Sequence, residues 1–156
     1  MQTQSLSTLS RDEILAGLLG ALSAEDQAQA DYEAQAQSCR LMSEVGEATD
    51  ITDTFEALRD VEQDHARRLV SRIVALGGSP ARRMVQPQLS DQGLSEWLVH
   101  DLLGEQWAIV EYARLIASIL DDDITVELMT ELLLDELRHA RWLKAALRSP
   151  AAAPVE

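Results

Sequence analysis

The sequence predicts an all-α protein, an antiparallel four-helix bundle with a long crossover between its second and third helices. Strong helix formers, chiefly Ala, Leu, Glu, Gln and Arg, dominate the 156 residues. Only four prolines occur, and none lies within a long periodic segment. Four segments of about 25–35 residues carry apolar residues at helical spacing, which is the pattern of helices packed in a bundle.

The first helix is expected to begin near Ser10 and to end before Gly46. Ser10 and Glu13 fit a capping box, in which two side chains satisfy free N–H groups of the first turn. One stripe of this helix is apolar at both ends and polar in the middle, and it comprises Leu15, Leu18, Leu22, Glu25, Gln29, Tyr32, Ala36 and Cys39. Polar groups on a stripe that faces the core need a partner there.

The other three helices are expected over residues 52–76, 94–120 and 124–147. A Gly-Gly pair followed by proline stops the second helix, and an acidic turn separates the third from the fourth. The connecting segment 79–93, "SPARRMVQPQLSDQG", is too long for a tight turn. Short loops favour antiparallel neighbours, so this long segment is expected to cross the length of the bundle and join two helix pairs.

Composition bounds the domain organisation and the partners. The chain is expected to form one domain over residues 1–148, with a short C-terminal tail at 149–156. The net charge of −14 argues against nucleic-acid binding, and the single cysteine, Cys39, excludes an internal disulfide. The sequence has no apolar run of roughly 20 residues, the length of a membrane span, and no signal peptide is recognised. A cytoplasmic protein is the expectation.

Two of the three histidines follow a glutamate at the same offset. Glu62 precedes His65 and Glu136 precedes His139, each by three residues, so both members of a pair share one helix face. A single Glu-x-x-His segment is weak evidence for a metal site. Both pairs, however, fall on the inner stripes of their helices, between flanking apolar residues: Phe55, Leu58, Leu69, Leu128, Leu132 and Leu143.

The third helix adds one more interior carboxylate. Glu105 lies on a stripe with Leu98, Asp101, Ala108, Tyr112 and Leu115. Four buried carboxylates, one from each helix, require positive charge, and no Lys or Arg lies on these stripes. One Glu from each of two helices and Glu-x-x-His from each of the other two is a known dinuclear ligand set of helix bundles. Two iron ions suit these O and N ligands, with manganese or zinc as substitutes.

Four segments carry a family resemblance. The stretches "LSAEDQAQADYEAQ", "DVEQDHARRLVSRIVALGGSP", "DLLGEQWAIVEYARLI" and "LLLDELRHARWL" resemble the ferritin-like superfamily, most closely bacterioferritin, over about residues 11–148. The resemblance implies terminal carboxylates at Glu25 and Glu105, bridging carboxylates at Glu62 and Glu136, and imidazole ligands at His65 and His139. It also places Tyr32 beside the metals and gives Asp101 and Asp135 positions from which they could orient the histidines.

The implied activity is ferroxidase chemistry, the oxidation of Fe²⁺ to Fe³⁺ by O₂ or H₂O₂ for iron storage or detoxification, in a homo-oligomer. Three departures from the family's pattern limit what the resemblance implies. Gln63 stands where the family's haem-ligating methionine would be, so haem is not expected. The family's inner-surface His and Asp fall on Ala57 and Val61. The nine residues after Leu147 are not expected to form the fifth short helix of a 24-subunit shell.

Three other functions remain open. A rubrerythrin-like peroxide reductase usually carries a rubredoxin domain with two CxxC pairs, and this chain has one cysteine. A diiron hydroxylase of an organic substrate such as a quinone needs a substrate channel, which the sequence does not mark. The last is a structural bundle or metal buffer without turnover. His100, the third histidine, is expected at the surface, away from Glu105.

Overall fold

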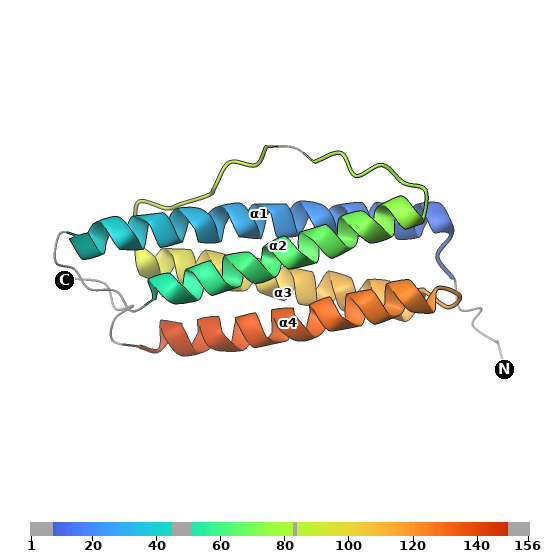
Figure 1. Ribbon diagram of the computed structural model, residues 1–156. Coiled ribbons are helices and arrows are strands. Elements are labelled where there is room, and N and C mark those ends of the chain that lie inside the picture. Colours follow the sequence, from blue (N-terminus) through green and yellow to red (C-terminus); the bar gives the residue numbers. More distant parts are fainter. Residues whose placement is uncertain (1–7, 45–50, 83, 150–156) are drawn as a thin grey trace.

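The computed structural model describes residues 8–44, 51–82 and 84–149 and confirms the all-α prediction. Its four helices are α1 (Arg11–Glu44), α2 (Thr52–Ala75), α3 (Leu94–Ser118) and α4 (Asp123–Leu147), laid side by side as a bundle (Figure 1). Their bounds agree with the expected ones to within two residues where these are described. Gly46 and the tail after residue 149 lie outside the described residues.

Local chemistry explains where the helices begin and end. The capping box of α1 is present: the Ser10 N–H donates to Glu13 Oε2 at 2.8 Å, and the Glu13 N–H donates to Ser10 Oγ at 3.4 Å. Asp122 caps α4 by accepting from the Thr125 N–H at 3.1 Å. Beyond the end of α2, Gly77 has a φ of 76°, the left-handed conformation that glycine adopts without strain.

The crossover between α2 and α3 runs along the bundle beside α1 (Figure 1). Polar contacts fasten it there: Gln27 Nε2 donates to the Gln86 carbonyl at 3.0 Å, and the Gln88 N–H donates to Asp31 Oδ1 at 2.6 Å. Because the crossover returns over the whole length of the bundle, α3 runs antiparallel to α1, and α4 runs antiparallel to α2. This arrangement decides which side chains of different helices meet.

The interior has two apolar clusters, one toward each end of the bundle. The first is built around Leu18, Ile73 and Leu132, and the second around Phe55 and Leu143. Buried charged residues lie between the two clusters. The core is therefore split by a polar layer, which the sequence predicted from the polar centres of the inner stripes.

The buried face of α1 differs from the expected stripe. Ile14, rather than Leu15, is buried, and Gln29 is only half-buried. Asp31 and Gln35 are buried instead, at 3% and 0% exposure. The reason is that α1 packs against both α2 and α3, so it buries two adjoining stripes rather than one. Within the described residues, no helix has the length and apolar character of a membrane span.

Candidate metal centre

The polar layer brings together the six side chains that the sequence singled out. All six are buried, with exposures between 1% and 6%: Glu25, Glu62, His65, Glu105, Glu136 and His139. They form two overlapping groups that could each hold a metal ion, and the candidate ligand atoms of each group lie within 4.8 Å of one another. Both groups contain Glu62 and Glu136, the shared pair. One group adds Glu25 and His65, and the other adds Glu105 and His139.

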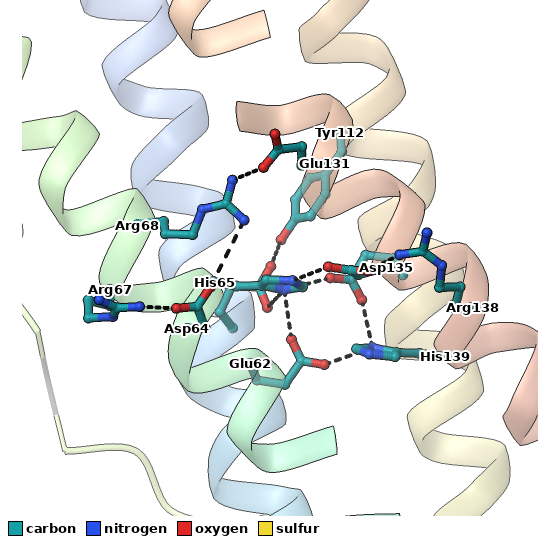
Figure 2. A network of polar contacts seen from close by, with 12 residues as sticks. Glu62, Asp64, His65, Arg67, Arg68, Tyr112, Glu131, Asp135, Arg138 and His139 are labelled. Carbon is teal, nitrogen blue, oxygen red and sulfur yellow. Dashed lines mark hydrogen bonds and ion pairs between the residues drawn. The ribbon is translucent and has the colours of Figure 1, made fainter. Parts of the chain in front are cut away.

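Each shared carboxylate presents one oxygen to each histidine. His65 Nδ1 lies 3.2 Å from Glu62 Oε2 and 3.1 Å from Glu136 Oε1. His139 Nδ1 lies 3.0 Å from Glu62 Oε1 and 3.4 Å from Glu136 Oε2 (Figure 2). A carboxylate with its two oxygens directed to two positions could bridge two metal ions. We call the position beside His65 the first position and that beside His139 the second.

The other two glutamates each face one position only. Glu25 Oε2 lies 3.4 Å from His65 Nδ1, and Glu105 Oε1 lies 3.6 Å from His139 Nδ1. Each could therefore complete one position as a terminal carboxylate. The resemblance implies the same division into bridging and terminal carboxylates, which stays a prediction.

Unsatisfied polar atoms indicate that the residues fit a metal pair. Both oxygens of Glu62, Oε1 of Glu136 and Nδ1 of His139 are buried without a hydrogen-bond partner among the described residues. They lie close to other ligand atoms, as the distances above show, but not in hydrogen-bond geometry. Each such atom costs about 1–3 kcal/mol if it stays unpaired. Cations at the two positions would satisfy all four atoms.

Ionisation in the metal-free centre follows a symmetrical pattern. Burial raises the pKa of Glu25 and of Glu105, and the neighbouring Glu62 and Glu136 add to the effect. Burial opposes ionisation of Glu62 and Glu136 as well, but close contacts with the histidines and with the other two glutamates lower the pKa of both.

The two histidines show the opposite balance. Burial alone would lower the pKa of His65 and of His139, but contacts with the surrounding carboxylates outweigh it. The pKa of His139 is raised to about 12, and that of His65 is raised further. In the absence of cations, these contacts favour the protonated form of both imidazoles.

Two tyrosines hold the terminal carboxylates. The Tyr32 hydroxyl donates to Glu105 Oε1 at 2.6 Å, so Tyr32 contacts one of the six candidate ligands. The Tyr112 hydroxyl donates to Glu25 Oε1, so both hydrogen bonds cross between α1 and α3. The sequence placed Tyr112 on the inner stripe but assigned it no role. The spacing could have indicated this contact, because each tyrosine follows the glutamate of its own helix by seven residues.

The two predicted orienting aspartates behave differently. Asp135 Oδ2 lies 3.2 Å from His65 Nε2, the ring nitrogen away from the carboxylates, where an acceptor could orient the ring. Asp101 instead accepts a hydrogen bond from Gln35 Nε2 at 2.9 Å. Its side chain faces α1 rather than a histidine, and burial raises the pKa of Asp101 to about 7.

A pocket of about 250 Å³ leads to the centre between α1 and α3. Leu103 and Trp107, exposed at 60% and 50%, lie at its mouth, and both terminal glutamates line its interior. His100 lines the same pocket and lies 3.4 Å from Asp31 through Nε2. With its side chain 46% exposed, His100 is the surface histidine that was expected, but it lies at the rim of this pocket.

The fold and the centre together define a class, the four-helix bundles whose buried Glu and His clusters are consistent with a diiron site. Residues 19–151 match the family model of the ferritin-like domain, and the chain belongs to this family.

Its relatives include bacterioferritins. The bacterioferritin of Brucella melitensis biotype 1 is 36% identical over 88 residues, which is 55% of this chain and 55% of that protein. The match thus spans about half the length of the curated relative. Bacterioferritin structures from Rhodobacter capsulatus and Mycobacterium tuberculosis superpose with TM-scores of 0.75 and 0.77, at 24% and 23% identity. Each superposition covers 90% of this chain and 86% of the other, which shows the shared fold.

Proposed function

We propose that the protein is a ferroxidase that binds two Fe²⁺ ions side by side and passes their electrons to O₂ or H₂O₂. The observation that carries the proposal is the pair of overlapping ligand groups that share Glu62 and Glu136. Each Fe²⁺ gives up one electron. With two protons, the electron pair converts O₂ to H₂O₂, or H₂O₂ to two molecules of water.

The residues have separate tasks in this reaction. Glu62 and Glu136 would hold the two substrate ions at a fixed separation, so that both electrons reach one oxidant molecule. Glu25 with His65, and Glu105 with His139, would complete the two positions. The negative charge of four carboxylates matches the positive charge of two divalent ions. Two Fe³⁺ products carry two more positive charges than the carboxylates neutralise. This favours either release of the products or uptake of hydroxide or oxide from water.

The surroundings support controlled access. The two apolar clusters close both ends of the centre, while the pocket between α1 and α3 gives a short path from solvent to the terminal glutamates. A small uncharged oxidant can pass along its apolar mouth at Leu103 and Trp107. The electrons are therefore expected to reach the oxidant inside the bundle rather than in bulk water.

The test is anaerobic loading with Fe²⁺, followed by addition of O₂ or H₂O₂, with ferric absorbance recorded over time. The wild-type chain should oxidise about two Fe²⁺ per chain in a fast phase. Glu136→Ala and His65→Ala should lose this phase, whereas Glu131→Ala, the same change at an exposed residue of α4, should keep it. Equal fast phases in all four proteins, or none in the wild type, would contradict the proposal.

The pocket also favours a second candidate, hydroxylation of a small organic substrate, because it connects an apolar mouth to the carboxylates. A rubrerythrin-like peroxide reductase is the remaining alternative. The three functions differ in what they consume: the hydroxylase needs an organic substrate with O₂, and the reductase consumes H₂O₂ catalytically when supplied with electrons. Repeated turnover with Fe²⁺ as the only reductant supports the ferroxidase. Sizing of the purified chain then tests the expected homo-oligomer.

A further inference from the structure

The two histidines of the centre differ in what holds their outer nitrogen. His65 Nε2 lies 3.2 Å from Asp135 Oδ2, and the other oxygen of Asp135 accepts from Arg138 (Figure 2). For His139, the ion pairs among the described residues are all made by Nδ1, on the carboxylate side of the ring. The outer nitrogen of His65 is thus held by the Asp135–Arg138 pair, whereas no charged pair within the described part of the chain holds that of His139.

The residues that precede the two Glu-x-x-His segments explain this difference. Asp135 immediately precedes Glu136 on α4, and it reaches across to the histidine of α2. The matching residue of α2 immediately precedes Glu62, and it is Val61. Because α2 and α4 run antiparallel (Figure 1), the two Glu-x-x-His segments face each other in opposite directions, and Val61 is the counterpart of Asp135 in this pair. Valine can neither accept a hydrogen bond nor carry a charge.

An acceptor behind a ligating histidine acts on metal affinity in two ways. It fixes the tautomer with its proton on Nε2, which leaves Nδ1 free to bind, and it makes the imidazole more basic. Loss of such a partner typically weakens metal binding 10–100-fold. Arg138 strengthens the arrangement, because its ion pair with Asp135 holds that carboxylate in place.

We propose that the two positions are inequivalent, and that the first position, supported by Asp135, binds a divalent cation about 10–100-fold more tightly than the second. The inference rests on the proposed dinuclear function. At low cation concentration the centre is then half-loaded, with one ion beside His65. Electron transfer in pairs requires both positions, so the second position sets the Fe²⁺ concentration at which oxidation begins.

Anaerobic titration with Co²⁺ tests this without any oxidation, because the visible absorption of Co²⁺ reports its ligand environment. The wild type should bind two equivalents in two resolved steps. At one equivalent, the ring resonances of His65 should show paramagnetic shifts of the directly bound imidazole, and those of His139 should not. The half-loaded state is thereby assigned to one position.

Three variants locate the cause. Asp135→Asn should weaken the first step 10–100-fold and bring the two steps together. Asp64→Asn is its control, since Asp64 also pairs with an arginine three residues later but contacts no histidine among the described residues. Val61→Asp should tighten the second step, and Val61→Asn, which is similar in size but uncharged, should tighten it less.

The outcomes separate this inference from the proposed function. If the wild type binds no Co²⁺ within the bundle, the dinuclear proposal itself fails. If it binds two ions with equal affinity, or if Asp135→Asn weakens the second step rather than the first, only the inequivalence is refuted. Asp135→Asn removes a single charge from a partly exposed site, so it keeps the test available even if Val61→Asp does not fold.

Discussion

Loading the centre with divalent cations should displace about two protons per cation. In the metal-free protein the raised pKa values favour a proton on each histidine and on each of Glu25 and Glu105. The lowered pKa values of Glu62 and Glu136 favour their ionised forms, and with this distribution two positive and two negative groups leave the metal-free centre neutral. Two divalent cations among four ionised carboxylates and two neutral imidazoles are neutral as well. Exchange of four protons for two cations therefore keeps the buried charge unchanged.

The sign of the pH dependence follows directly. Protons compete with cations for the same atoms, so acidification weakens cation binding and alkalisation strengthens it until the protons are gone. With two protons displaced per cation, each pH unit changes the affinity for each cation by about 100-fold. Loading should accordingly fall steeply on acidification, and it should begin to fall above the ordinary pKa of a glutamate, because the pKa values of Glu25 and Glu105 are raised.

The measurement is titration with Zn²⁺, which is redox-inert, in a weakly buffered solution held at constant pH by metered base. The base consumed gives the protons released, and about four per two Zn²⁺ are expected. Glu25→Gln removes one titratable group without changing the size of the side chain, so its total should drop to about three. A release of one proton or none from the wild type would refute the assigned protonation states.

Three further predictions follow from individual residues. Tyr112→Phe should weaken Zn²⁺ binding about tenfold by calorimetry, because the lost hydrogen bond is stronger to ionised than to protonated Glu25. Equal affinity would contradict this. Asp122→Ala should lower the free energy of unfolding by about 1–2 kcal/mol in urea, through loss of the α4 cap, and the exposed neighbour Asp121→Ala should not. The purified protein should lack a Soret band, because Gln63 stands at the haem-ligand position of the resemblance.

The fold and the six candidate ligands were accessible from sequence because both depend on periodicity within single helices. The offset between Glu62 and His65 fixes their common face whatever the rest of the chain does. The apolar residues around them fix that face as inward. Because burying unpaired carboxylates is costly, the sequence then predicts a metal site, and this inference requires no knowledge of the contacts between helices.

Contacts between helices were harder to predict. Asp101 was expected near a histidine, but the register between α3 and α1 places it opposite Gln35. Gln29 was assigned to a single inner stripe of α1, although that helix has two neighbours and buries Asp31 as well. Register and the number of neighbours are set by the whole bundle, so a stripe drawn on one helix cannot supply them.

The tyrosine pair shows how an equal offset on two helices becomes informative once their directions are known. Seven residues advance about 10 Å along a helix and return to nearly the same face. If α1 and α3 ran in parallel, both tyrosines would lie to the same side of the glutamates, and at most one could reach across at the right height. Because the helices run antiparallel, the displacement that brings Tyr32 level with Glu105 also brings Tyr112 level with Glu25. The long crossover, which sets the direction of α3, therefore also determines that both terminal carboxylates are held.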